Sequence, residues 1–269
     1  MGPTLREECH ENFLAVWTGL EGTPGFVVDR YRGLTLVRTG VSFGPFNPVI
    51  ALDRPETLDG VAERIRRLMV DRSTPWVLVT TADSAPALAP LIDEFHLGRR
   101  RTSPGMVLEL APSPSPSYPS DLDIHAVTEP EEVRVFWRVA TEGLEVPRGL
   151  LDPWMNALEG VTRQRARAMG CYLGYAAGLP VATSMRIVTG RVAGVYWVTT
   201  LKDVRRRGYG TAMTWRAALE GARVGCTKSY LSASAMGFPV YEKMGYRTFE
   251  EYQYWASAPA PKDSPSKSS

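Results

Sequence analysis

The chain has 269 residues and a formal net charge of +2; 44% of its residues are hydrophobic and 22% are charged. This composition predicts a soluble globular protein with one large domain or two ordinary ones. The near-neutral charge does not favour a nucleic-acid-binding or membrane-surface protein, because both usually need a basic excess on one face.

The cysteines Cys9, Cys171 and Cys226 are widely spaced, and the sequence has no CxxC pair. We therefore expect neither a disulfide framework nor a zinc site, and a reducing cytoplasm fits best. His10 and His96 carry no ligand pattern, so we expect no metal. We also expect no membrane helix and no signal peptide, because the apolar runs are too short. The preference for Arg over Lys is typical of a bacterial, GC-rich genome.

In the N-terminal half, residues 74–81 and 102–110 predict strands, and residues 84–98 predict a helix that ends in glycine. Residues 111–121 (APSPSPSYPSD) predict an extended linker, because proline recurs every second or third residue. Residues 256–269 have the composition of a disordered tail.

The C-terminal half predicts a strand at 123–128, helices at 129–144 and 150–158, and three strand-like runs at 171–178, 179–188 and 191–200. A helix to about residue 224 follows, and then a strand at 228–234, a short helix at 238–246 and a strand at 247–255. This order favours a mixed sheet in an α/β or α+β domain. The strand–helix–strand endings of the two halves align on Gly98 and Gly245, which indicates an internal duplication, although any α/β protein can offer such a match by chance.

Residues 203–213 read DVRRRGYGTAM, in which three arginines run into Gly208 and Gly210 ahead of a helix. A helix N-terminus presents unpaired N–H groups and partial positive charge, and glycine lets a ligand approach the backbone. These features predict a pyrophosphate site, with a solvated charge run as the alternative. A P-loop would need a lysine after Gly210, and a dinucleotide fingerprint would need glycine where Met213 stands.

The remaining pattern is R-x-x-G-x-G, and the segment VYWVTTLKDVRRRGYGTAMT resembles the coenzyme A site of the GNAT superfamily, the acyl-CoA-dependent N-acyltransferases. A second segment, SAMGFPVYEKMGYRTF, is similar to that family's second motif through Tyr241 and the triplet 244–246. The resemblance covers about residues 121–255. It implies an α/β (α+β) fold of two GNAT-like domains, each a mixed, mostly antiparallel sheet flanked by helices. We expect a degenerate copy at 1–110, the linker at 111–121, a catalytic domain at 122–255 and the tail at 256–269.

The resemblance further implies acyl transfer from acetyl-CoA, the co-substrate, to an amine in a ternary complex. The backbone N–H of Val198 would stabilise the oxyanion, and Tyr241 would protonate the leaving thiolate as general acid. The residues implied to hold the coenzyme are Val198, Thr199, Thr200, Arg205, Arg206, Arg207, Gly208, Tyr209, Gly210, Thr211, Ser234 and Tyr241.

The sequence departs from the family pattern at two places. Ser234 stands where the family often has Asn, and its hydroxyl reaches less far. The strand at 191–200 lacks the glutamate that many members use as general base. Glu142 or Glu145, between the first two predicted helices, is a candidate base, although both fit equally well as solvated carboxylates. His125 fits a structural role better than a catalytic one.

The aromatic residues do not identify the acceptor. Trp137, Trp154 and Met155 fit either an apolar acceptor site or the core, and Tyr196 and Trp197 fit core and pocket wall. The leading expectation is a bacterial, cytoplasmic N-acetyltransferase for a small-molecule amine, as monomer or homodimer, without a nucleic-acid, membrane or metal partner. The alternatives are a catalytically degenerate acyl-CoA-binding module and a protein lysine or N-terminal acetyltransferase.

Overall fold

The computed structural model describes residues 3–110, 116–158 and 169–257. Its strands form one sheet in the order β1-β2-β3-β4-β11-β5-β10-β9-β8-β7-β6. Neighbouring strands are antiparallel except for β3 with β4 and β9 with β10, which are parallel. The expected mixed, mostly antiparallel sheet is therefore confirmed. In the described residues no helix is long and apolar enough to span a membrane.

The N-terminal half contains α1 (Leu5–Thr18), β1 (Val27–Tyr31), β2 (Leu34–Arg38), β3 (Pro48–Ala51), α2 (Val61–Leu68), β4 (Val77–Thr81), α3 (Ala89–Glu94) and β5 (Leu97–Glu109). The elements before residue 74 were not predicted. β2 and β3 are buried at nearly every position, so they lack the polar–apolar alternation that marks a half-exposed strand.

The C-terminal half contains β6 (Asp123–Ala126), α4 (Pro130–Gly143), α5 (Leu151–Leu158), β7 (Cys171–Ala176), β8 (Leu179–Thr189), β9 (Val192–Thr200), α7 (Tyr209–Arg223), β10 (Lys228–Ser232), α8 (Phe238–Lys243) and β11 (Arg247–Ser257). These follow the predicted order. β11 runs two residues into the predicted tail, because Ala256 and Ser257 pair with Gly98 and Leu97. The rest of that tail, and the first part of the predicted linker, lie outside the described residues.

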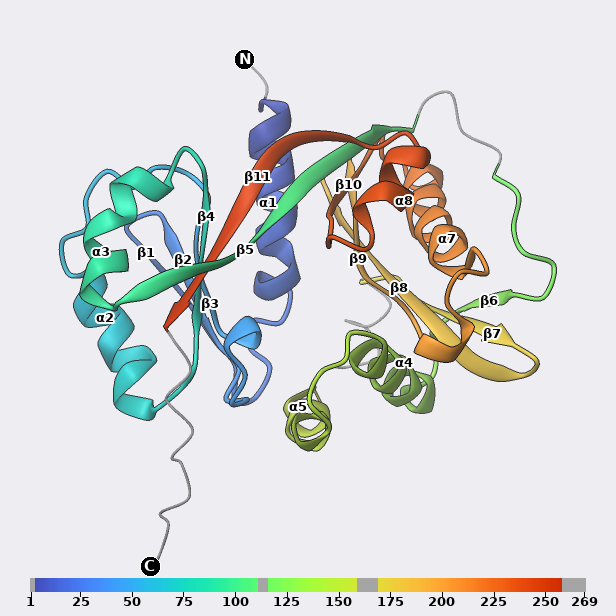
Figure 1. Ribbon diagram of the computed structural model, residues 1–269, viewed down its shortest axis with the longest axis horizontal. Coiled ribbons are helices and arrows are strands. Elements are labelled where there is room, and N and C mark those ends of the chain that lie inside the picture. The colour runs from blue at the N-terminus through green and yellow to red at the C-terminus, as the bar shows by residue number, and fades with distance from the viewer. Residues whose placement is uncertain (1–2, 111–115, 159–168, 258–269) are drawn as a thin grey trace, which may run out of the picture.

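The two halves exchange their last strands. β11 pairs with β4 of the N-terminal half, and β5 pairs with β10 of the C-terminal half, while β5 and β11 also pair with each other. Figure 1 shows both strands running diagonally from one half to the other. Each half therefore completes its sheet with a strand from the other half.

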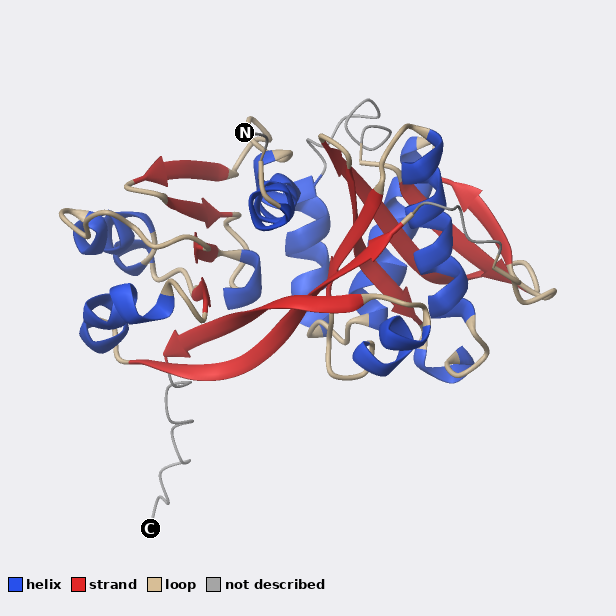
Figure 2. Ribbon diagram, turned by 90° about the horizontal axis from the view of Figure 1, so that it is seen from above, coloured by secondary structure: helices blue, strands red, loops and turns tan. Residues whose placement is uncertain are grey.

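Helices cover both faces of this shared sheet (Figure 2). In the N-terminal half, α2 and α3 pack on one face around Ile65 and Leu91, and α1 packs on the other. In the C-terminal half, α7 and α8 cover one face, whereas α4 and α5 cover the opposite face. Helix α1 also contacts β8 and β9, so it joins the two halves on the α4 face.

Candidate active site

The parallel strands β9 and β10 diverge in the middle of the C-terminal half. They pair only at Val192–Gly194 with Lys228–Tyr230, whereas β9 continues to Thr200. The β10-facing edge of β9 beyond Gly194 has no neighbouring strand in the described part of the chain. An extended ligand can hydrogen-bond to such a free strand edge.

A β-bulge lies on this free stretch of β9. The register with β8 shifts between Met185 and Thr183, and Trp197 takes a left-handed φ of 51°. The Thr183 hydroxyl donates to the Trp197 carbonyl at 2.8 Å, which holds the bulge. Further along, the Leu201 N–H donates to Val181 of β8 at 2.9 Å. Because N–H groups alternate along a strand, the N–H of Val198 faces the side from which β10 has departed.

Helix α7 begins beside the end of β9. Its N-cap is Gly208, with φ of 82°, and no side chain caps the helix. In the structure as described, the N–H groups of Tyr209, Gly210 and Thr211 have no hydrogen-bond partner. A Cβ added to Gly210 would meet only the Thr200 hydroxyl, at 3.7 Å, so there is free space beside the backbone at this position. This helix start fits a pyrophosphate group.

The neighbouring predicted coenzyme residues differ in orientation. Arg206, at φ of 70°, and Arg207 are exposed. Tyr209 turns inward, and its hydroxyl donates to Asp121 at 2.6 Å. Thr199 is buried, and its hydroxyl lies 2.8 Å from that of Thr183. The side chains of Tyr209 and Thr199 therefore support the backbone and do not face the helix start.

Tyr241 projects from α8 into the apolar cluster that includes Val198 and Met213. Burial raises the pKa of its phenol to about 12, and the Thr214 hydroxyl beside it acts in the opposite direction. The phenol is therefore protonated at neutral pH and can donate a proton but cannot accept one. Ser234 is exposed, and its hydroxyl accepts from the Gly237 N–H at 3.1 Å in the turn that precedes α8.

The candidate bases Glu142 and Glu145 lie in the last turn of α4 and just after the helix. Glu142 and Glu145 line a cavity of about 1040 Å³ between α4, α5 and the segment after β9, and neither Val198 nor Tyr241 lines that cavity. Glu145 is ion-paired with Arg205 at 3.0 Å. His125 lies on β6, at the edge of the sheet, where it contacts Asp123.

Aromatic side chains fill the α4 face beside the bulge. Trp197 lies 4.9 Å from Trp137 and 6.1 Å from Trp154, between ring centroids. Phe46, from the N-terminal half, lies 4.1 Å from Trp154 and 6.2 Å from Trp197. Trp137 and Trp154 are buried, so they belong to the core. No sequence spacing predicted the contribution of Phe46, because it comes from the other half of the chain.

In the described residues of the N-terminal half, the parallel strands do not diverge as β9 and β10 do. β3 and β4 pair along the whole of β3, and the hydroxyls of Thr81 and Ser84 donate to the carbonyls of Leu52 and Ala51 just beyond. The N-cap of α2, Gly60, is also left-handed, but the Tyr31 hydroxyl occupies the space that a Cβ would take.

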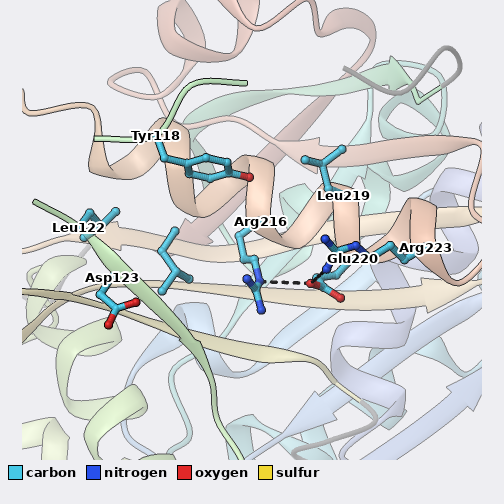
Figure 3. A pocket seen from close by; sticks show the side chains of 8 residues that line it. Tyr118, Leu122, Asp123, Arg216, Leu219, Glu220 and Arg223 are labelled. Atoms are coloured by element: carbon cyan, nitrogen blue, oxygen red, sulfur yellow. Dashed lines mark hydrogen bonds and ion pairs between the residues drawn. The ribbon is translucent and has the colours of Figure 1, made fainter. Parts of the chain in front are cut away.

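A second, smaller cavity, of about 310 Å³, lies on the outer side of α7 (Figure 3). Tyr118 lies over it, and Arg216 and Arg223 are both ion-paired with Glu220. It shares no lining residue with the start of α7. Among the described residues, no group of His, Cys, Asp and Glu could hold a metal ion.

Residues 130–246 match the model of the acetyltransferase (GNAT) family. A GCN5-related N-acetyltransferase from Kribbella flavida superposes with a TM-score of 0.70 at 18% identity, over 96% of this chain and 98% of that one. A second, from Sphaerobacter thermophilus, has a TM-score of 0.60 at 18% identity, over 92% and 88%. A tandem GNAT protein from the clavulanic acid biosynthesis pathway has a TM-score of 0.59 at 16% identity, over 97% and 92%.

No functionally curated protein matches the sequence significantly. The structural matches extend over nearly the whole chain, so they show the fold of both halves. Residues 130–246 are thus an acetyltransferase domain of the GNAT family, and the N-terminal half has a GNAT-like fold.

Proposed function

We propose that this protein is an acyl-CoA-dependent N-acyltransferase that moves an acetyl group to the amine of a small molecule. The observation that carries the proposal is the conjunction of the bulged, unpaired edge of β9 with the partnerless N–H groups at the start of α7. The first fits a pantetheine arm, and the second fits the pyrophosphate at its end. The GNAT family match over this segment supports acetyl-CoA as the co-substrate.

Different residues of this chain carry the separate steps of the proposed acyl transfer. The amides of Tyr209, Gly210 and Thr211 bind the pyrophosphate, and the N–H of Val198 stabilises the oxyanion as the amine attacks the thioester carbonyl. As the C–N bond forms and the C–S bond breaks, Tyr241 gives its proton to the thiolate. No carboxylate stands on β9, so the attacking amine arrives neutral or loses its proton to a base elsewhere, for which Glu142 and Glu145 are the candidates.

The N-terminal half supports a small acceptor. Phe46 covers the α4 face beside the bulge by packing on Trp154 and Trp197. A protein tail would need an open groove on that face, and this packing favours a small molecule instead. No second coenzyme site is proposed in the N-terminal half, because β3 and β4 do not diverge.

The absence of a carboxylate from β9 and the serine at position 234 favour a second candidate function, an acyl-CoA-binding module that does not catalyse transfer. Two measurements separate the candidates. Calorimetric titration with acetyl-CoA tests binding, and thiol release from acetyl-CoA across a panel of amines tests turnover. Saturable binding with turnover supports the enzyme, and binding with no turnover for any amine supports the module. Absence of binding would contradict both.

A further inference from the structure

The guanidinium of Arg205 bonds to three groups, none of which belongs to α7. Its Nε donates to the Thr200 carbonyl at 3.0 Å, one terminal nitrogen donates to the Gly143 carbonyl at 2.9 Å, and the other to the Glu145 carboxylate at 3.0 Å. One side chain therefore joins the end of β9, the end of α4 and the segment that leads to α5.

These contacts make Arg205 unlike its two neighbours. Its side chain is 22% exposed, and its charge is compensated by Glu145. Arg206 and Arg207 are exposed and stand closer in sequence to the partnerless amides. To reach a phosphate, Arg205 would have to release two backbone carbonyls, and such charge-assisted hydrogen bonds are stronger than those between neutral groups.

The end of α4 packs directly against β9, the strand whose free edge is proposed to bind the coenzyme. A Cβ on Gly143 would lie 2.7 Å from the Thr199 side chain. The Thr199 hydroxyl also lies 3.4 Å from the Val139 carbonyl of the same helix. The hydrogen bond from Arg205 to Gly143 therefore adds to a contact between α4 and β9 that is already closely packed.

Glu145 occupies a position where glycine is the usual residue. Its N–H donates to Glu142 and the next N–H, of Val146, donates to Thr141, which is a Schellman ending of α4. Glu145 takes a left-handed φ of 56°, which is unfavourable for a residue with a side chain. Among the described residues, that side chain is ion-paired with Arg205.

This junction also borders the cavity of about 1040 Å³. Glu142, Glu145 and Val146 form part of one wall, and Leu201 to Val204 form part of another. Arg205 bonds to Glu145 of the first wall, and in the sequence it directly follows Val204 of the second wall. Resting on the function proposed above, we propose that Arg205 is a positioning residue. It holds the segment between α4 and α5 against the end of β9, and it is not a ligand of the pyrophosphate.

The first test compares substitutions at Arg205 with one at Arg206, by calorimetric titration with acetyl-CoA. We expect both Arg205→Gln and Arg205→Lys to weaken affinity about 5- to 150-fold, the usual range of a coupling between sites. Lysine keeps the charge but cannot bond three groups in a fixed plane. Arg206→Gln is expected to flatten the dependence of affinity on NaCl concentration, whereas Arg205→Gln leaves that dependence unchanged.

The second test uses Glu145→Gly, which removes the carboxylate that Arg205 binds but relieves the left-handed strain. We expect its melting temperature to equal or exceed that of the wild type while acetyl-CoA affinity falls several-fold. In the Arg205→Gln background the same change should have no further effect on affinity, which is the signature of a direct coupling. Hydrogen exchange adds an independent readout: acetyl-CoA should slow exchange at 143–148 in the wild type but not in Arg205→Gln.

The outcomes separate this inference from the proposed function. Affinity restored to within about twofold by Arg205→Lys, or additive effects of the Arg205 and Glu145 changes, would overturn the positioning role alone. Failure of the wild type to bind acetyl-CoA would overturn the inference together with the proposed function.

Discussion

Gly208 and Gly210 contribute differently to the start of α7. Gly208 has φ of 82°, so any side chain there is strained. Gly210 lies inside the helix with an ordinary φ, and an added Cβ would meet only the Thr200 hydroxyl at a normal contact distance of 3.7 Å. Gly210 is therefore not needed by the fold, and the backbone approach of a ligand is its remaining role.

We predict that Gly210→Ala separates coenzyme binding from stability. The methyl group covers the amides that face the pyrophosphate, so acetyl-CoA affinity should fall by at least about tenfold. Stability should hold or rise, because alanine favours a helix by about 1 kcal/mol over glycine. A binding titration and a thermal melt check this, and equal losses in both would contradict it.

Tyr241→Phe is predicted to affect the chemical step and not binding. With an amine identified by the panel, kcat should fall by about 10² to 10⁴, the range for a lost general acid, while acetyl-CoA affinity changes less than about twofold. Since burial raises the pKa of this phenol to about 12, it stays protonated at lower pH. Below about pH 11, the wild-type kcat should therefore not fall through deprotonation of Tyr241. An unchanged kcat in the variant would remove Tyr241 from the mechanism.

At the scale of elements, α1 and β9 are joined by Asn12. Its amide nitrogen donates to the carbonyls of Ile187 and Val192 and to the Thr189 hydroxyl, and its oxygen accepts from the Tyr196 hydroxyl at 2.7 Å. The helix approaches so closely because residue 194 has no side chain. A helix of the N-terminal half thereby fixes the strand that carries the bulge.

Gly194→Ala is predicted to break this junction. Its Cβ would lie 1.8 Å from Asn12 Oδ1 and 2.5 Å from a ring carbon of Tyr196, so helix or strand must move. We expect a loss of about 3 kcal/mol in the free energy of unfolding, at the upper end for overpacking. Gly149→Ala is the matched control, because nothing lies within 4 Å of its added Cβ. Denaturant titration of both variants measures the difference, and equal midpoints would refute the close approach.

At the scale of the whole molecule, the exchanged strands make the two halves interdependent. Without β11, β4 and β5 lose the strand between them, and without β5 the same happens to β10 and β11. Each isolated half would expose an unpaired strand edge and part of the apolar cluster around Tyr230 and Tyr252.

We therefore predict that the halves fold only together. Residues 1–115 and 116–269, produced as two separate chains in one cell, should associate and copurify through a tag on either one. Each produced alone should aggregate, because its open edge invites pairing with other chains. Size-exclusion chromatography checks this, and a soluble, folded monomer of either half would show that the exchange is dispensable.

The sequence by itself determined the elements of the C-terminal half and the start of α7. Helical and strand periodicities, the run of arginines and the glycine at the helix N-cap are local features, and residues close in sequence set the backbone there. The resemblance in residues 121–255 agrees with the match to the GNAT family model. The roles assigned to Val198 and Tyr241 remain predictions.

Only the tertiary structure decided how distant segments meet. Arg205 bonds to Glu145 from 60 positions away, and Tyr196 bonds to Asn12 from 184 positions away. The exchange of β5 and β11 is likewise invisible in the strand patterns, since either partner offers a compatible edge. Periodicity shows which face of an element is buried, but many packings can bury that face. The choice among them rests on close contacts such as those at Gly143 and Gly194, which exist only once the elements are placed together.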